Sequence, residues 1–102
     1  MTDALRRTTR VVVTLSGLVQ GVGFRFTVLR IAARHPVAGT VRNLHSGDRL
    51  EIDTEGDAVE VEAFLREVLE NPPRGARVDR VERRTAQPRG ATGFTEASSA
   101  EA

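Results

Sequence analysis

The stretch GLVQGVGFR, residues 17–25, is a glycine-punctuated loop that lies between an apolar run and a helical pattern. Before it, residues 11–15 are rich in β-branched side chains, which is typical of a strand. After it, apolar side chains recur at helical spacing at Phe24, Val28 and Ile31. Because a strand, a glycine loop and a helix N-terminus together form a common anion site, this stretch predicts one.

Arg25 breaks a rule of helix electrostatics. It lies in the first turn of the predicted helix, where the helix dipole disfavours a cation by about 0.3–1 kcal/mol. The glycines of the loop allow positive φ angles, so that backbone N–H groups can point toward a ligand. A bound phosphate would turn the repulsion at Arg25 into attraction, because guanidinium matches phosphate oxygens with two hydrogen bonds. The loop is therefore predicted to bind phosphate.

Composition and charge exclude several classes of chemistry. The 102 residues include no cysteine and no lysine, which excludes disulfides, thiolate catalysis and Schiff-base chemistry. A net charge of +1 favours neither nucleic acid nor an anionic membrane as a partner. Residues 1–10 contain no apolar signal-peptide core. We expect one cytoplasmic, monomeric domain over residues 1–102, with an ordered core at about residues 10–96 and flexible ends.

A β-hairpin is predicted after the first helix. The helix ends at about Arg34, because the following His35 precedes a proline and avoids the α region. Residues 37–44 are typical of a strand, and residues 45–48 supply turn residues. We therefore expect Asn43 near the tip of the hairpin.

The second strand of the hairpin alternates in polarity. Leu50 and Ile52 are separated by charged side chains, namely Arg49, Glu51 and Asp53. This alternation predicts a strand with one buried face and one face in solvent.

A second helix follows this strand. Asp57 with Glu60 three residues later resembles a capping box at the start of a helix. The apolar positions that follow keep helical spacing over two turns and are expected in the core: Val61, Phe64, Leu65, Val68 and Leu69.

The C-terminal part of the chain predicts two further strands. The spacing of Val78 and Val81 indicates a strand that either begins after Val78 or contains a bulge. The arginines of residues 77–84 are interspersed with acidic side chains, which is typical of a solvated strand face. Residues 93–95 predict a short last strand, and residues 98–102 a disordered tail.

The order of elements is β-α-β-β-α-β, which predicts an α+β fold of the ferredoxin-like, split β-α-β type. In this sandwich an antiparallel sheet carries both helices on one face, and the other face is partly open to water.

Two motifs resemble those of the acylphosphatases: GLVQGVGFR at residues 17–25 and GTVRN at residues 39–43. Residues 55–57 and 76–79 also fit this family, and the similarity spans about residues 10–95. The resemblance implies the fold given above. It also implies an enzyme that hydrolyses acyl phosphates to a carboxylate and inorganic phosphate, with no metal and no cofactor.

The resemblance further implies a role for each matched residue. Arg25 and Asn43 would be catalytic, Arg25 by holding the phosphoryl group and Asn43 by orienting the attacking water. The phosphate-binding loop would comprise Val19, Gln20, Gly21, Val22, Gly23, Phe24 and Arg25. An acyl phosphate would be the substrate and inorganic phosphate a product or inhibitor, with neither nucleic acid nor a membrane as a partner.

Two positions depart from the family pattern. Thr40 stands where many relatives carry an aromatic residue, and residues 94–98 form a weaker last strand than the family usually has. We expect these departures to affect packing and edge-strand order, and neither of them to touch Arg25 or Asn43.

Taken singly, the same residues have plainer explanations. The loop alone could be a tight strand-to-helix connection, Arg25 a surface ion-pair arginine and Asn43 a turn residue. His35 and His45 stand at no spacing that links them to other ligands, so neither is predicted to bind a metal or act in catalysis.

Three functions follow from these patterns, of which an acylphosphatase is favoured. The alternative is a non-catalytic phosphate-binding regulatory module on the same fold. Family-like domains also occur inside larger carbamoyl-transferring maturation proteins, but a length of 102 residues favours a free-standing enzyme. An RNA-binding domain needs stacking aromatic residues on its sheet, and four Phe with no Trp or Tyr make it the weakest of the three.

Overall fold

The computed structural model describes residues 7–100, and residues 1–6 and 101–102 lie outside the described part. Along the chain the elements are β1 (Thr8–Leu18), α1 (Phe24–Ala32), β2 (Ala38–Asn43), β3 (Arg49–Asp57), α2 (Ala58–Glu70), β4 (Arg77–Ala86) and β5 (Phe94–Glu96). This is the predicted β-α-β-β-α-β order followed by a short fifth strand. Within residues 7–100, no helix has the length and apolar character needed to cross a bilayer.

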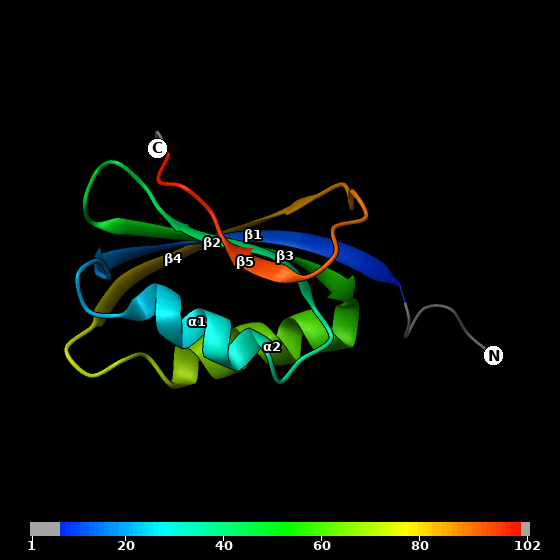
Figure 1. Ribbon diagram of the computed structural model, residues 1–102, viewed down its shortest axis with the longest axis horizontal. Helices are drawn as coiled ribbons and strands as arrows, with labels where there is room; N and C mark the ends of the chain where they lie inside the picture. Colours follow the sequence, from blue (N-terminus) through cyan, green and yellow to red (C-terminus); the bar gives the residue numbers. More distant parts are fainter. Residues whose placement is uncertain (1–6, 101–102) are drawn as a thin grey trace.

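The sheet has the predicted architecture, with one difference at its edge. Its strand order is β4-β1-β3-β2-β5, and both helices lie on the same face of it (Figure 1). Neighbours among β4, β1, β3 and β2 pair antiparallel. β5 pairs parallel with β2, so the prediction of a wholly antiparallel sheet is wrong at this edge. The reason is that residues 87–93 carry the chain from one edge of the sheet to the other before β5 begins.

The core lies between the sheet and the two helices. Its largest fully buried side chains include Leu15, Phe24, Ile31, Leu50, Ile52 and Phe64. Burial of one such side chain stabilises the fold by about 1.5–3 kcal/mol. Leu69 is 41% exposed, so its prediction as a core residue is wrong. It lies about 100° further round α2 than the buried Val68, which takes it past the edge of the apolar stripe.

The helix boundaries differ in detail from the predicted ones. α1 ends at Ala32 rather than Arg34, because the N–H groups of Arg34 and His35 donate to carbonyls three residues earlier instead of four. At the start of α2, Asp57 makes no side-chain capping hydrogen bond. The predicted capping box is therefore wrong.

His35 joins the two helices. Its Nε2 lies 2.7 Å from Oε1 of Glu67 on α2. Its ring also packs edge-on against Phe64, with 5.9 Å between the ring centroids. These contacts fix the end of α1 against the middle of α2.

A β-bulge lies where β1 passes β4. The register between the two strands shifts at Ser16 and Gly17, which leaves Asp79 without an opposite residue. Of the two explanations for the valine spacing in β4, the bulge is confirmed. A Cβ on Gly17 would lie 2.3 Å from the carbonyl oxygen of Arg77, so this crossing requires glycine.

The polar face of β3 is half-buried at Arg49 and Glu51 and buried at Asp53 and Glu55, so its prediction as a solvent face is wrong in the second half of the strand. Asp53 and Glu55 are only 7% and 6% exposed. Arg10 donates through Nε and Nη2 to the two carboxylate oxygens of Asp53, at 2.9 and 2.7 Å. The backbone N–H groups of Arg89 and Gly90 donate to Glu55 at 3.2 and 2.9 Å. Alternation therefore predicted which side chains share this face, but not that distant arginines and backbone would cover it.

Acid should weaken the fold through Asp53. The hydrogen bonds from Arg10 hold the pKa of this carboxyl below its usual value. Asp53 therefore stabilises the fold above its usual pKa, and the stabilisation is lost as the pH falls through the lowered pKa. We expect Asp53→Asn to lose about 1–3 kcal/mol of unfolding free energy at about pH 7. When the pH is lowered to about 3, the unfolding free energy of the variant should fall by less than that of the wild type, as measured by urea denaturation.

Asp79→Asn is the matched control for this experiment. The Asp79 side chain is 51% exposed and pairs with Arg77 two residues away, so its loss should leave the denaturation midpoint at about pH 7 close to that of the wild type. Equal pH dependence of stability in the wild type and in Asp53→Asn would contradict the role given to Asp53.

Candidate active site

The predicted phosphate loop borders a cleft of about 210 Å³. The following predicted residues line it: Val19, Gln20, Gly21, Gly23, Phe24, Arg25 and Asn43. Val22 does not, because its side chain packs against the hydrophobic core. The fold thus brings the two motifs of the sequence to the walls of a single cleft.

Two glycines shape the loop. Gly21 and Gly23 have φ angles of 77° and 80°, in the left-handed region that side chains with a Cβ rarely adopt. Gly23 is the N-cap of α1, and its carbonyl accepts the first helical hydrogen bond, from the N–H of Thr27 at 3.1 Å. The N–H groups of the first helical turn have no earlier carbonyl to bond, so they are available to an anion at this end of the helix.

Gln20 fastens the loop to the β2–β3 hairpin. Its side-chain Nε2 donates to the carbonyl oxygens of Leu44 and Arg49, at 2.7 and 2.8 Å. Those two residues flank the hairpin turn, and Leu44 directly follows Asn43. One side-chain amide therefore sets the distance between the loop and the end of β2.

Arg25 is paired with Glu96 on β5. Its Nη1 lies 2.6 Å from Oε2 of Glu96, and the two side chains are 37% and 46% exposed. Glu96 also lines the cleft. The expectation that the weak last strand would not touch Arg25 is therefore wrong.

Glu96 is a residue of the cleft that the sequence did not indicate. A cation in a first helical turn calls for an anion nearby, but nothing along the chain shows which acidic residue supplies it. Glu96 reaches Arg25 because β5 pairs with β2, opposite Val41. Phe94, at the start of β5, packs edge-on against Phe64 of α2, with 5.4 Å between the ring centroids. That contact anchors the short strand.

Asn43 is the last residue of β2, and its side-chain oxygen is unusual. The Oδ1 atom is buried and accepts no hydrogen bond from any residue that the structure describes. Most buried polar atoms have a partner, so an orphan calls for an explanation. Because Asn43 lines the cleft, a water or ligand bound there could supply the missing donor.

The C-terminal segment also holds the backbone beside Asn43. The N–H of Ala100 donates to the carbonyl of Asn43 at 3.2 Å, and the N–H of His45 donates to the carbonyl of Ala100 at 2.7 Å. The predicted disordered tail is therefore wrong for residues 98–100, and residues 101–102 lie outside the described part.

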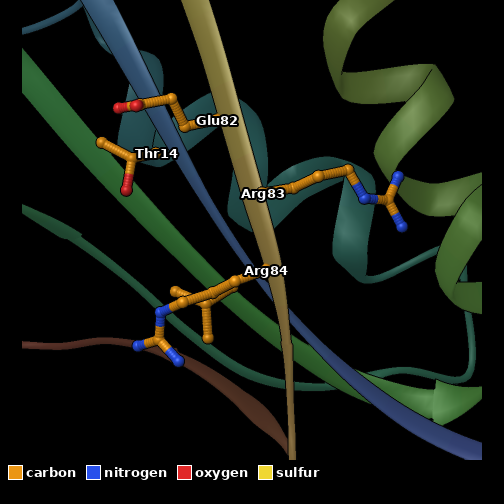
Figure 2. A pocket seen from close by; sticks show the side chains of 5 residues that line it. Thr14, Glu82, Arg83 and Arg84 are labelled. Atoms are coloured by element: carbon orange, nitrogen blue, oxygen red, sulfur yellow. The ribbon is translucent and has the colours of Figure 1, made fainter.

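A second hollow, of about 320 Å³, lies over β1 and β4. Figure 2 shows Thr14, Glu82 and Arg84 extending to one side of these strands, and Arg83 extending to the other side toward α2. This hollow is lined by strand side chains alone and includes neither a glycine loop nor a helix N-terminus. We therefore place the candidate active site at the loop of residues 19–25.

Comparison with known proteins points to one family. The family model for acylphosphatase matches residues 11–96. An acylphosphatase of Thermococcus kodakarensis is 46% identical over 78 residues, which cover 76% of this chain and 84% of the relative.

Solved structures agree with this match. The crystal structure of an acylphosphatase from Bacillus subtilis has a TM-score of 0.80 and 29% identity, and the match covers 87% of this chain and 98% of that one. Full-length HypF, in its phosphate- and nucleotide-bound form, has a TM-score of 0.86 and 35% identity over 94% of this chain. The chain spans only 12% of the length of HypF.

Loss of the Gln20 amide should loosen the cleft. Gln20→Leu keeps the size of the side chain but removes the two hydrogen bonds that the amide donates to Leu44 and Arg49. The two carbonyls then keep their backbone donors, the N–H groups of Gly47 and Leu44. We expect a loss of about 1–3 kcal/mol in unfolding free energy, measured by urea denaturation. Gln87→Leu is the control, because Gln87 is exposed and lies outside the cleft. Equal stability of the two variants would contradict the tethering role of Gln20.

Proposed function

The chain belongs to the acylphosphatase family, and we propose that it uses Arg25, Asn43 and the loop of residues 19–25 to hydrolyse acyl phosphates without a metal ion. It is a hydrolase that acts on acid anhydrides, as its relatives are. The assignment of Arg25, Asn43 and the loop rests on the observation that they line a single cleft. Arg25, the start of α1 and Asn43 line it together, and the buried Oδ1 of Asn43 has no partner among the residues that the structure describes.

The phosphoryl group is the part of the substrate that this cleft can hold. N–H groups at the start of α1 and the guanidinium of Arg25 both supply positive charge at this cleft. Phosphoryl transfer depends mainly on positioning and on stabilisation of charge on the phosphoryl oxygens. Bound phosphate would also remove the unfavourable placement of a cation in a first helical turn.

Asn43 is proposed to orient the attacking water. Its free Oδ1 can accept a hydrogen bond from that water, which would aim a lone pair of the water oxygen at phosphorus. The water oxygen then bonds to phosphorus while the bond from phosphorus to the acyl oxygen breaks. The acyl group leaves as a carboxylate, and a phosphoryl oxygen takes the proton of the water. No side-chain acid is needed in this scheme, because a carboxylate is a good leaving group. No side-chain base is needed either, because a phosphoryl oxygen takes the proton.

The same geometry would also serve a non-catalytic module that binds phosphate. HypF, a much longer protein, contains a region similar to this chain and was solved with phosphate and nucleotide bound. A binding module would retain affinity for inorganic phosphate and would show no turnover.

The cytoplasmic location and the monomeric state stay predictions from the sequence.

Arg25→Ala should remove most of the activity and leave the fold intact. Loss of a preorganised charge-stabilising donor costs on the order of 10²–10³ in rate, and Arg25 is partly exposed, so little packing is lost. The measurement is the hydrolysis of benzoyl phosphate in the presence of a chelator. Arg30→Ala is the matched control, because Arg30 is an exposed arginine near the other end of the same helix.

Two outcomes would decide against the proposal. Turnover of Arg25→Ala close to the wild-type rate would contradict the role of Arg25. Phosphate binding by the wild type without any hydrolysis of benzoyl phosphate would support the regulatory module instead.

Asn43→Ala should lower kcat more than it weakens phosphate binding. The proposed role of Asn43 concerns the water, so the affinity for inorganic phosphate as an inhibitor should change less than about twofold while kcat falls by about 10²-fold or more. Steady-state kinetics and phosphate titration measure the two quantities. A large loss of phosphate affinity with kcat retained would make Asn43 a binding residue.

A further inference from the structure

Two exposed side chains of opposite character stand at the mouth of the cleft, Phe26 and Glu96. We propose that they make the site select acyl phosphates whose acyl group is apolar and uncharged over those whose acyl group carries a second negative charge. This inference rests on the proposed function, because it concerns the part of the substrate that leaves as a carboxylate.

Phe26 presents an apolar surface next to the phosphate loop. Residues two positions apart on a helix point to nearly opposite sides of it. Phe24 is therefore buried in the core at 1% exposure, while Phe26 is 70% exposed. A large apolar side chain in solvent beside a ligand cleft is a typical contact for an apolar ligand group. Phe26 lines the same cleft as Arg25, so an acyl group that extends outward from the phosphoryl position can contact the phenyl ring.

Glu96 supplies negative charge at the same mouth. In the structure its carboxylate is compensated by Arg25, at 2.6 Å. When a phosphoryl dianion takes up the charge of Arg25, the carboxylate of Glu96 is no longer fully compensated. A second carboxylate on the acyl group would then meet a like charge. Glu96 is 46% exposed, so water and salt screen this repulsion without removing it.

The two contacts act in the same direction. Phe26 favours an apolar acyl group, and Glu96 disfavours an anionic one. The phosphoryl end is common to all acyl phosphates, so selection among them must come from groups that lie beyond Arg25. Phe26 and Glu96 are side chains of that kind on the wall of this cleft.

The test compares three acyl phosphates: benzoyl phosphate, which is aromatic, acetyl phosphate, which is small, and succinyl phosphate, which carries an extra carboxylate. The quantity compared is kcat/KM of each variant relative to the wild type, so that differences in intrinsic reactivity cancel. Acetyl phosphate is the reference, because a substitution that disturbs Arg25 or the phosphate loop in general changes kcat/KM by the same factor for all three substrates.

Phe26→Ala should lower the benzoyl-to-acetyl ratio about three- to tenfold, which corresponds to the loss of one aromatic contact. Phe26→Leu should restore part of the ratio, because leucine keeps apolar surface. The matched control is Val59→Ala, since Val59 is 59% exposed on α2 and lies outside the cleft. This control should leave the ratio unchanged.

Glu96→Gln should raise the succinyl-to-acetyl ratio roughly two- to fivefold, the size expected for one exposed charge interaction. The gain should shrink at high salt. The matched control is Glu82→Gln, because Glu82 is an exposed glutamate that also pairs with an arginine, Arg80, and lies on β4 away from the cleft.

Unchanged ratios in both Phe26→Ala and Glu96→Gln, with all three substrates still hydrolysed, would overturn the selectivity proposal and leave the proposed function standing. A rise of the succinyl-to-acetyl ratio in Glu82→Gln as large as that in Glu96→Gln would also overturn it, because the effect would then come from net charge. Failure of the proposed function looks different, since the wild type would then hydrolyse none of the three substrates.

Discussion

The candidate site depends on the two hydrogen bonds that the Gln20 amide donates to the β2–β3 hairpin. Arg25 and Asn43 lie on separate elements, a helix and the end of a strand, which the hydrophobic core alone would hold at a less defined distance. Gln20 joins the loop before that helix to the backbone on both sides of the hairpin turn, at 2.7 and 2.8 Å. A site that works by positioning needs such a fixed distance more than it needs reactive side chains.

Local patterns in the sequence predict most of the fold and the two principal site residues. Helical and alternating periodicity are local properties, so they place the helices, the hairpin and the loop. The motifs then place Arg25 and Asn43, which the structure brings to one cleft. What the sequence does not predict depends on contacts between distant segments. The burial of Asp53 depends on Arg10, and the pairing of Arg25 depends on Glu96, which lies on a strand of three residues with little pattern of its own.

The C-terminal segment belongs to the architecture of the site as well as to the edge of the sheet. β5 pairs with β2 and is anchored by Phe94 on Phe64, and Ala100 bonds the backbone of Asn43. The segment thereby brings the acidic side chain of Glu96 to the guanidinium of Arg25. It also stiffens the strand end that carries the proposed water-orienting amide. β5, which has a weak strand pattern in the sequence, thus contributes to the site through its position rather than through its own stability.

The opposite edge of the sheet has a different consequence. β4 is ten residues long, and within residues 7–100 it pairs with β1 on one side only. The backbone N–H and C=O groups on its outer side could pair with a strand from another molecule, which is the first step of amyloid-like assembly. The charges along β4, among them Arg80, Glu82 and Arg83, are exposed, and a docking strand would have to dehydrate them. The charges on this edge therefore protect the protein against aggregation at high protein concentration.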